Sequence, residues 1–376
     1  MNYTCCTHCV LDVSDSFITF DDKGVCNYCN EYRKKEKEFI REKESKVYDS
    51  FISRIKKSRK QSEYDCIIGI SGGLDSSWLL YLAKQSGLNP LAVHYDCGWN
   101  TENAVNNIEK LVNQLKVDLY TYVVNWEEFR DVQLAYLKAG VVDLEIPTDH
   151  SFMASLYKTA AKFKVKYILT GHNFVTEGIM PRSWVYNKGD AVNLMDIHRR
   201  FGKIKRLESF PVINLINKFY YYNVKRIENV HLLNYADYVK STASKILAEQ
   251  FDWKQHPVKH GESIWTRFYQ CYILPARFGI DKRRAHLSTL ICSGQITREE
   301  ALNELLMPVY DPHLFHSDKE FVQKKFGITD HEMDQYMLLS NAKHEDYKTD
   351  LIIKQAYNAI RNTFSLTKDL KISHRY

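Results

Sequence analysis

Three absences limit what this chain can be. It has no uninterrupted apolar run of the roughly 18 residues that a membrane span needs, and its first residues, MNYTCCTHCV, lack the basic segment and apolar stretch of an export signal. We therefore expect a cytoplasmic protein. Glycine and proline are scarce, at 15 and 8 of 376 residues, and no repeat or low-complexity segment is visible, which excludes fibrous and disordered classes.

The composition that is present predicts a globular protein of more than one domain. Hydrophobic residues make up 44% of the chain and charged residues 26%, and the length corresponds to about two to three domains at roughly 150 residues each. The net charge of +6 suits an anionic ligand or a nucleic acid and does not choose between them.

The nine cysteines are distributed unevenly, with five of them before residue 30. Two Cys-x2-Cys pairs, sixteen residues apart, have the spacing of a four-thiolate zinc ribbon: Cys6, Cys9, Cys26 and Cys29. In a chain without an export signal this clustering favours a metal over disulfides. Cys5 and His8 are competing ligands, and a redox-active pair or an iron–sulfur cluster is the alternative interpretation. A closed four-cysteine zinc site would be structural.

The apolar pattern divides the chain into three parts. Residues 1–60 combine the cysteine unit with a charged helical linker. Residues 61–240 alternate apolar runs (CIIGI, PLAVHYD, VDLYTYVV, VKYILTGHN) with helical periodicity, which predicts an α/β domain with a parallel sheet covered on both faces. Residues 241–376 have a helical pattern (STASKILAEQF, RRAHLSTLICSG, TREEALNELL, HEMDQYMLLS, LIIKQAYNAI) and form a helical C-terminal region.

The first strand of the α/β domain runs into a glycine turn and then a helix. The turn lacks the Lys-Ser/Thr of a Walker loop and the G-x-G-x-x-G of a dinucleotide fingerprint. Backbone N–H groups of such a turn, next to a helix N-terminus, favour a phosphate, and glycine permits its close approach. The alternative is a plain turn with Asp75 or Ser76 as helix cap. The order S-G-G-x-D-S resembles the pyrophosphate loop of the ATP pyrophosphatases, with the candidate residues Ser71, Gly72, Gly73, Asp75 and Ser76.

Polar residues that follow later strands belong to the same edge of the sheet. Ligands of open α/β sheets bind at the carboxyl ends of the strands, where His94 follows PLAV and Gly171 and His172 follow KYILT. The stretch TGHN resembles the corresponding segment of pyrophosphatase-loop enzymes that modify tRNA. We therefore expect these three residues to lie near ATP.

The glycine turn carries no cation, although a departing pyrophosphate needs charge neutralisation. The stretch from residue 257 to 294 supplies candidates, of which we assign catalytic roles to Lys259, Arg267, Lys282 and Arg283 together with Asp75. Most of the six basic residues of this stretch, taken singly, are better interpreted as a solvated helix face. Thr297 and Glu300 have capping-box spacing and mark a helix start.

Taken together, the cysteine pairs, ISGGLDSS, TGHN, KHGESIWTRFYQ and DKRRAHLSTLICSGQITREEAL make the chain resemble an N-acetyl sugar amidotransferase over roughly residues 4–310. The resemblance implies a sheet of the adenine-nucleotide α-hydrolase (PP-loop ATPase) type. It also implies that ATP, with Mg²⁺, activates an acetamido group of a nucleotide-linked sugar through an O-adenylyl imidate, which ammonia converts to an acetamidino group. Members act in lipopolysaccharide (LPS) O-antigen or flagellin-glycan biosynthesis, and the O-antigen enzymes for UDP-linked diacetamido uronic acids are the most similar.

Ammonia needs a source, and no glutaminase nucleophile is visible, since Met1 is followed by Asn2. The resemblance implies a glutaminase partner and a cyclase-like ammonia channel. The alternative function is a tRNA-modifying thiolase or adenylating enzyme, which needs a reactive cysteine; Cys66 lies inside the first strand, so Cys97 is the candidate. A non-enzymatic zinc-ribbon binding module is a third class, and it leaves the pyrophosphate loop unexplained.

Overall fold

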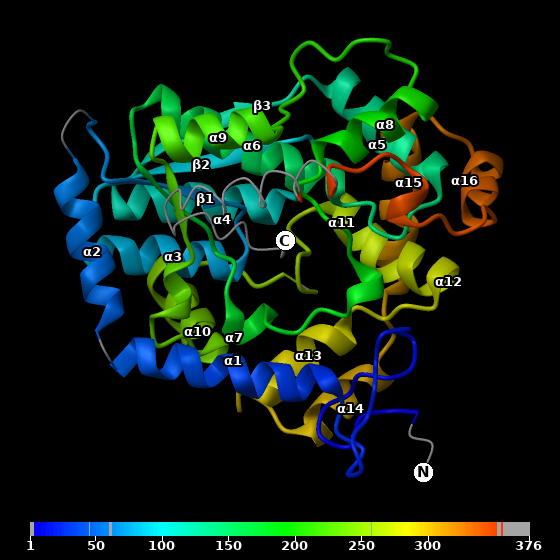
Figure 1. Ribbon diagram of the computed structural model, residues 1–376, viewed down its shortest axis with the longest axis horizontal. Helices are drawn as coiled ribbons and strands as arrows, with labels where there is room; N and C mark the ends of the chain where they lie inside the picture. The colour runs from blue at the N-terminus through cyan, green and yellow to red at the C-terminus, as the bar shows by residue number, and fades with distance from the viewer. Residues whose placement is uncertain (1–3, 45, 60–61, 257, 352–354, 356–376) are drawn as a thin grey trace.

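The computed structural model describes residues 4–44, 46–59, 62–256, 258–351 and 355, and its centre is a parallel β-sheet (Figure 1). The strand order is β3-β2-β1-β4-β5, and each neighbouring pair is parallel. The strands are β1 (Cys66–Ile70), β2 (Pro90–Asp96), β3 (Asp118–Val123), β4 (Tyr167–Leu169) and β5 (Glu228–Val230). The predicted α/β class is confirmed, and four strands lie in the four predicted runs. The edge strand β5 was missed because it has three residues, one of them buried.

Helices cover both faces of the sheet. All five side chains of β1 are buried, as expected for a central strand covered on both faces. Its alternate residues divide between two clusters: Ile68 packs with Leu79 and Leu247 on one face, whereas Ile67 packs with Leu156 on the other. The covering helices are α3 (Leu74–Gln85), α4 (Glu102–Leu115) and α10 (Lys240–Phe251) on the first face, and α6 (Ile146–Lys162) on the second.

Further helices complete the α/β part of the chain. They are α5 (Trp126–Ala139), α7 (Phe174–Glu177), α8 (Ala191–Phe201), α9 (Leu215–Phe219), the π-helix η2 (Tyr220–Val224), and the 3-10 turns η1 (Arg182–Trp184) and η3 (Leu232–Asn234). The predicted boundary at residue 240 falls at the start of α10, which contacts α3 and α4. Division of the chain at that residue therefore remains a prediction.

The N-terminal cysteine unit leads into two charged helices, α1 (Asn27–Glu44) and α2 (Val47–Ser58). They follow the predicted helical linker, and Lys46, with φ 55°, separates them. In Figure 1, α1 runs along the bottom of the molecule beside α13, and contacts join these two helices.

The region beyond residue 251 is helical, as predicted. It contains α11 (Ile264–Phe268), the π-helix η4 (Tyr269–Ile273), α12 (Leu274–Phe278), α13 (Arg283–Cys292), α14 (Arg298–Leu306), α15 (Pro312–Phe326), α16 (Asp330–Met337) and the 3-10 turn η5 (His344–Asp346). Thr297 and Glu300 form the predicted capping box of α14. The helix α15 was not predicted, and most of the predicted helix LIIKQAYNAI lies outside the described residues.

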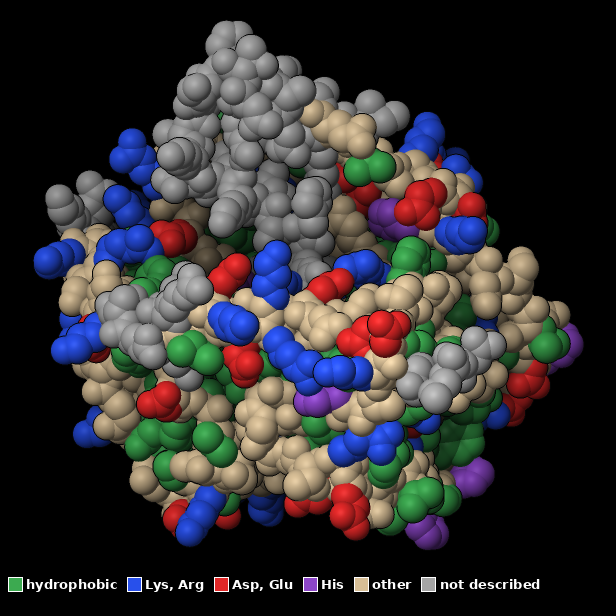
Figure 2. All heavy atoms as spheres, turned by 60° about the horizontal axis from the view of Figure 1, so that its bottom comes forward, with side chains coloured by type: hydrophobic (Ala, Val, Ile, Leu, Met, Phe, Trp, Pro, Cys, Tyr) green, Lys and Arg blue, Asp and Glu red, His purple; other side chains and the backbone are tan. Residues whose placement is uncertain are grey.

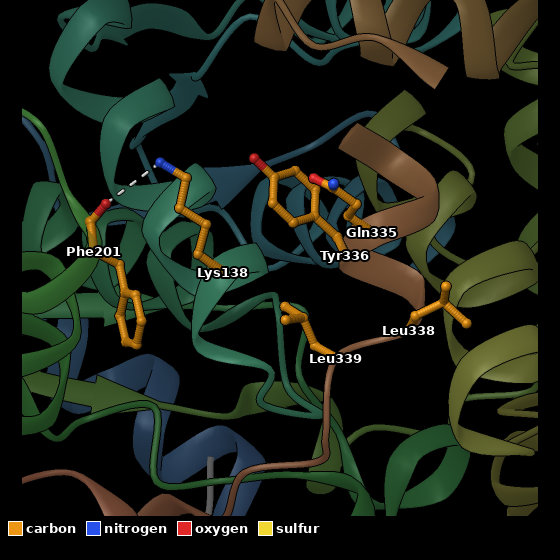
Figure 3. A pocket seen from close by; sticks show the side chains of 6 residues that line it. All are labelled: Lys138, Phe201, Gln335, Tyr336, Leu338 and Leu339. Atoms are coloured by element: carbon orange, nitrogen blue, oxygen red, sulfur yellow. Dashed lines mark hydrogen bonds between the residues drawn. The ribbon is translucent and has the colours of Figure 1, made fainter. Parts of the chain in front are cut away.

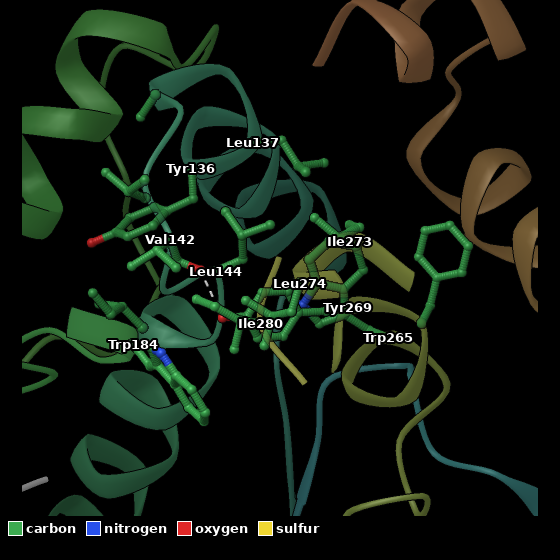
Figure 4. Packing of buried hydrophobic residues seen from close by; sticks show 14 of the residues in the cluster. Tyr136, Leu137, Val142, Leu144, Trp184, Trp265, Tyr269, Ile273, Leu274 and Ile280 are labelled. Carbon is green, nitrogen blue, oxygen red and sulfur yellow. Dashed lines mark hydrogen bonds between the residues drawn. The ribbon is translucent and has the colours of Figure 1, made fainter. Parts of the chain in front are cut away.

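The largest hydrophobic cluster joins distant parts of the chain. It contains the four clustered cysteines, residues of α5, and residues of α11 to α13. Figure 4 shows its centre, where Val142 and Leu144 from the segment after α5 lie against Tyr269, Ile273 and Leu274. Within the described residues, no helix has both the length and the apolarity needed to cross a membrane.

Candidate active site at the carboxyl edge of the sheet

The glycine turn after β1 leaves the N-terminus of α3 open. Gly72 has φ +80°, and a Cβ there would lie 2.4 Å from the carbonyl oxygen of Ala104, so only glycine fits. Gly73 is the N-cap, and among the described residues no side chain caps this helix. Ser76 Oγ instead accepts a hydrogen bond from Ser71 N at 3.2 Å. The N–H groups of the first helical turn are therefore free to bind an anion, and the interpretation of Asp75 or Ser76 as a helix cap is wrong.

The position of this turn is fixed by donors from other elements. The carbonyl oxygen of Gly72 accepts hydrogen bonds from Asn107 Nδ2 at 3.1 Å and Trp253 Nε1 at 3.2 Å, and His256 Nε2 also lies 3.2 Å from it. A carbonyl held on one side directs the following N–H groups to the other. The turn is consequently rigid before any ligand arrives.

The turn lies where the strand order reverses. The chain moves from β1 outward to β2 and β3 and then returns to β4 beside β1, so the crevice between β1 and β4 is the expected ligand site. Gly171, after β4, approaches so closely that a Cβ there would lie 2.7 Å from Ser76 N. His94 lies near the carboxyl end of β2, the other strand next to β1. It is buried, and its Nδ1 lies 3.2 Å from the carbonyl oxygen of Ile70. The structure thus brings the two loops together at the turn.

Asp75 is at the centre of a polar network. Its Oδ1 accepts a hydrogen bond from Asn173 Nδ2 at 3.3 Å and another from the hydroxyl of Tyr238, and Lys259 Nζ lies 3.8 Å from Oδ2. Burial, followed by the negative charge of Asp75, raises the pKa of Tyr238 far above its usual range, so this phenol stays a donor. The carboxylate is therefore oriented by fixed donors.

Glu177, at the end of α7, joins three basic side chains. Lys259 Nζ lies 3.1 Å from its Oε1, His172 Nδ1 lies 2.7 Å from its Oε2, and His260 Nε2 lies 3.6 Å from Oε1. Burial opposes ionisation of Glu177, but Lys259 and His172 outweigh it and hold its pKa well below its usual value. Burial lowers the pKa of Lys259, whereas Glu177 and Asp75 raise it by more. Glu177 and Lys259 are therefore both charged at neutral pH.

The turn that carries Lys259 is strained and closely packed. His260 has φ +60°, which is uncommon outside glycine. Burial, with Lys259 beside it, lowers its pKa to about 3, so its ring is neutral. The ring lies 5.5 Å from that of His286 on α13, whose two nitrogens are buried without a hydrogen-bond partner among the described residues. Both histidines stand in stretches that carry the family resemblance, KHGESIWTRFYQ and DKRRAHLSTLICSGQITREEAL, but neither was assigned a role from the sequence.

A third carboxylate, Glu262, lies directly on the glycine turn. Ser71 Oγ donates to its Oε1 at 3.2 Å, and a Cβ on Gly73 would come within 2.8 Å of the same oxygen. The segment is anchored beside β2, because Thr101 N donates to the carbonyl of Glu262 at 2.9 Å. Burial raises the pKa of Glu262. Apart from its presence in KHGESIWTRFYQ, nothing local pointed to this residue.

The structure separates the predicted basic residues into two groups. Lys259 lies at the turn, and Lys282 interacts electrostatically with His260 and His286 of the same network. Arg267 instead makes a buried two-point ion pair with Asp318 on α15, at 2.6 and 2.8 Å. Arg283 pairs with Asp281 and donates to carbonyls at the end of α14. Both arginines are committed to structural partners.

A second charged cluster continues from Lys282. Lys188 pairs with Asp149 in the first turn of α6, and Lys282 interacts with both of them and with Asp143 and Glu145. Sequence analysis assigned no role to the four partners of Lys282. The run LEIPTDH contains two of these acids, Glu145 and Asp149, but nothing in it indicates Lys282, which lies more than 130 positions later.

The cysteine cluster has the geometry of a tetrahedral thiolate site. The Sγ separations are 3.9 Å for Cys6 and Cys29, 3.7 Å for Cys9 and Cys26, and 3.6 Å for Cys26 and Cys29. Zinc–sulfur bonds of about 2.3 Å place tetrahedral ligands about 3.8 Å apart. The four buried residues therefore fit zinc, and Cys5 is outside the set.

The cysteine unit is docked on the C-terminal helices. Arg298 donates to the carbonyls of Cys9 and Cys6, Arg284 donates to the carbonyl of Val10, and Ser288 Oγ accepts from Val10 N. These three residues come from α13 and the start of α14. A further thiol at the end of α13, Cys292, lies 3.7 Å from Cys29, and no spacing rule could have found it. The unit thus supports the helix that carries His286.

The two thiols of the α/β part of the chain are poorly placed for chemistry. Cys66 and Cys97 are both buried. Burial raises the pKa of Cys97 to about 12, and it also raises that of Cys66. Since the thiolate is the reactive form, neither residue is an activated nucleophile.

Other surface features offer less chemistry. A pocket of about 600 Å³ (Figure 3) is open and largely apolar, and its lining residues are Lys138, Phe201, Gln335, Tyr336, Leu338 and Leu339. It includes no residue of the glycine turn. On the face drawn in Figure 2, basic and acidic side chains are intermixed, so this face lacks the continuous basic field typical of nucleic-acid binding.

Comparisons with known proteins match different parts of the chain. Residues 262–361 match the family model for the C-terminal domain of WbpG-like LPS biosynthesis proteins. The tRNA(Ile)-lysidine synthase of Chlamydia pneumoniae is 36% identical over 70 residues, 18% of this chain and 22% of that protein. The 7-cyano-7-deazaguanine synthase of Methanospirillum hungatei is 34% identical over 91 residues, 24% of this chain and 37% of that protein. The chain thus spans between about a fifth and two fifths of these relatives' lengths.

Among solved structures, an NH3-dependent NAD synthetase from Campylobacter jejuni matches 76% of this chain and 96% of its own at 17% identity, with a TM-score of 0.33. An NMN synthetase from Francisella tularensis matches 54% of this chain and 74% of its own at 16% identity, with a TM-score of 0.29.

Proposed function

We propose, from the premise that this chain belongs with the WbpG-like LPS biosynthesis proteins, that it is an ATP-dependent, AMP-forming amidotransferase. Its reaction converts an acetamido group of a nucleotide-activated sugar to an acetamidino group in O-antigen biosynthesis. The observation that carries the proposal is the uncapped, rigid glycine turn between β1 and β4, with Asp75, Lys259 and Glu262 around it.

The residues of the turn fit the phosphates of ATP. The first turn of α3 offers N–H groups at a helix N-terminus, and Ser71 and Ser76 place hydroxyls beside it; the N–H of Gly73 donates to Ser71 Oγ at 3.3 Å. Gly171, His94 and His172 line the same edge. A Cβ at Gly73 would strike the carboxylate of Glu262, which indicates how little space separates the turn from that side chain.

Two carboxylates at the turn suit Mg²⁺, a cation that prefers oxygen ligands and bridges phosphates. We assign Asp75 and Glu262 to hold it, since each faces the turn and neither has a fully committed ion pair. Lys259 neutralises charge on the pyrophosphate as it departs. We leave Arg267 and Arg283 out of this machinery, because their guanidinium groups are bound by Asp318 and Asp281.

The chemistry overcomes the poor electrophilicity of an amide. The amide oxygen of the sugar attacks the α-phosphorus of ATP, an O–P bond forms, and pyrophosphate leaves. Ammonia then attacks the imidate carbon, the C–O bond to AMP breaks, and loss of a proton from nitrogen leaves the amidine. The ammonia comes from a glutaminase partner with a cyclase-like channel, and zinc at Cys6, Cys9, Cys26 and Cys29 is structural.

The test incubates the purified protein with ATP, Mg²⁺ and an ammonium salt, together with a UDP-linked N-acetylated sugar or with tRNA. AMP and pyrophosphate should form only with the sugar, and glutamine should replace ammonium only when a glutaminase is added. Asp75→Ala should abolish AMP formation, whereas Asp237→Ala serves as a control from the same region. AMP release triggered by tRNA would support the thiolase alternative, and ADP as the product would reject the pyrophosphatase chemistry.

A further inference from the structure

Glu145 is a buried carboxylate with one oxygen left over. It is the residue before α6 and is 5% exposed. Its Oε2 accepts a hydrogen bond from Thr266 Oγ1 at 3.0 Å, while its Oε1 is buried with no hydrogen-bond partner in the part of the chain that the structure describes. An unpartnered buried oxygen costs free energy, so its retention calls for a donor.

The fold places Glu145 beside the ATP turn. Thr266, which holds it, is four residues after Glu262 in the sequence, and Glu262 contacts Ser71 of the glycine turn. The segment that leads to Glu145 is packed under the same helical run, where Tyr269 donates to the carbonyl of Val142 at 2.7 Å (Figure 4). The α6 N-terminus also faces the carboxyl edge of the sheet, because α6 returns the chain to the start of β4.

The charges around Glu145 favour a small cation. Three carboxylates, Asp143, Glu145 and Asp149, share two basic side chains, Lys188 and Lys282, so the cluster carries one more negative than positive charge when Glu145 is ionised. Because Oε1 is buried, a partner that binds it must be small. Ammonium has about the size of water, carries one positive charge and donates hydrogen bonds.

We propose, on the basis of the function proposed above, that Glu145 binds ammonium and acts as the catalytic base of the second half-reaction, in which ammonia displaces AMP. Ammonium donates a hydrogen bond to Oε1 and then transfers that proton to it. An N–H bond breaks, an O–H bond forms, and the electron pair left on nitrogen attacks the imidate carbon. The neutral carboxylic acid gives up the proton to water that enters the site after AMP has left.

The surroundings tune Glu145 for this exchange. Burial, followed by the negative charge of Asp149, raises its pKa to about 8. The titratable and charged groups that act on it come from several elements: Cys97, Asp143, Asp149, Lys188, Tyr269 and Lys282. A base with this pKa accepts a proton from ammonium more readily than an ordinary carboxylate does.

The experiment separates the two half-reactions. Exchange of labelled pyrophosphate into ATP, driven by the UDP-sugar without ammonium, reports adenylation, and amidine formation with ammonium chloride reports the second step. Glu145→Gln, which keeps an acceptor for Thr266, should leave exchange within about threefold and lower kcat/KM for ammonium at least tenfold. Glu127→Gln, an exposed side chain on α5, is the matched control.

The pH profile adds a readout that a structural role would not change. With wild type, kcat/KM for total ammonium should rise to about pH 8 and fall where ammonium itself deprotonates; with Glu145→Gln it should simply follow free ammonia. Equal loss of exchange and amidination, or an unchanged profile, would overturn the inference. Absence of exchange in the wild-type protein would instead overturn the proposed function.

Discussion

At the scale of single residues, Gly72 decides whether the phosphate site can exist. Two independent restrictions exclude other residues at this position. The backbone φ is left-handed, and a Cβ would collide with helix α4. Gly279 shares the left-handed φ, at +66°, but has open space around its missing Cβ. Substitution of Gly279 therefore tests backbone strain alone, whereas substitution of Gly72 tests strain and collision together.

We expect Gly279→Ala to lower the free energy of unfolding by about 1 kcal/mol, through backbone strain alone. Gly72→Ala should lower it by more than about 2 kcal/mol and abolish AMP formation, because the helix carbonyl at Ala104 must also move. Urea denaturation and an AMP assay measure both effects. Equal destabilisation by the two substitutions, with AMP formation retained, would contradict this account of the turn.

Arg267 was predicted to be catalytic, and its buried pair with Asp318 offers a direct comparison. Breaking a buried ion pair costs about 3 to 5 kcal/mol, whichever partner is changed. We therefore expect Arg267→Gln and Asp318→Asn, each of which removes one charge of the pair, to destabilise the protein similarly and to leave AMP formation per folded molecule within about threefold. A loss near 100-fold for Arg267→Gln alone would restore the catalytic role.

At the scale of elements, the cysteine unit and α13 depend on each other. Backbone carbonyls of the unit are held by Arg284 and Arg298, and the helix between them carries His286 toward the ATP turn. Loss of the metal should therefore affect the active site as well as the N-terminus.

The prediction for this unit is one zinc per chain in the purified protein. Cys26→Ser should lose the metal, because a tetrahedral site with three thiolates binds more weakly, and limited proteolysis should then cleave within residues 4–44 first. Cys5→Ser, outside the four-cysteine set, should keep both metal and protease resistance. Iron equal to or above zinc after anaerobic purification would reject the zinc assignment.

At the scale of the whole molecule, buried neutral histidines make stability depend on pH. His150 on α6 is 2% exposed; its Nδ1 donates to the carbonyl of Lys188 at 2.9 Å, and its Nε2 accepts from Ile213 N at 3.1 Å. Protonation of Nε2 would remove that acceptor. Burial lowers the pKa of His150 to about 4, against about 6.5 in the unfolded chain.

Between about pH 6.5 and pH 4 the unfolded chain therefore binds more protons than the folded one, so the free energy of unfolding falls as the pH falls. His150 contributes at most about 1.4 kcal/mol of this loss per pH unit. We expect His150→Gln to flatten this slope in urea denaturation at pH 7, 6 and 5. His331→Gln, on the exposed helix α16, should leave the slope unchanged. Identical slopes for wild type and His150→Gln would show that His150 titrates normally.

The sequence determined the features that depend on neighbouring residues. Continuous apolar runs predicted β1 to β4, the two Cys-x2-Cys pairs predicted the sulfur cluster, and Ser-Gly-Gly-Leu-Asp-Ser predicted the turn, because backbone freedom and strand burial are set locally. Chain length, composition and the capping box of Thr297 and Glu300 are equally local.

Only the tertiary structure decided which side chains meet at that turn. Glu262 contacts Ser71 across 191 positions, and Thr266 holds Glu145 across 121. Arg267 looked equally basic in the sequence, yet Asp318 engages it from α15, a helix that was not predicted. A buried charged side chain needs a partner from another element, and for Arg267 that partner depends on the packing of α11 against α15, which no local pattern specifies.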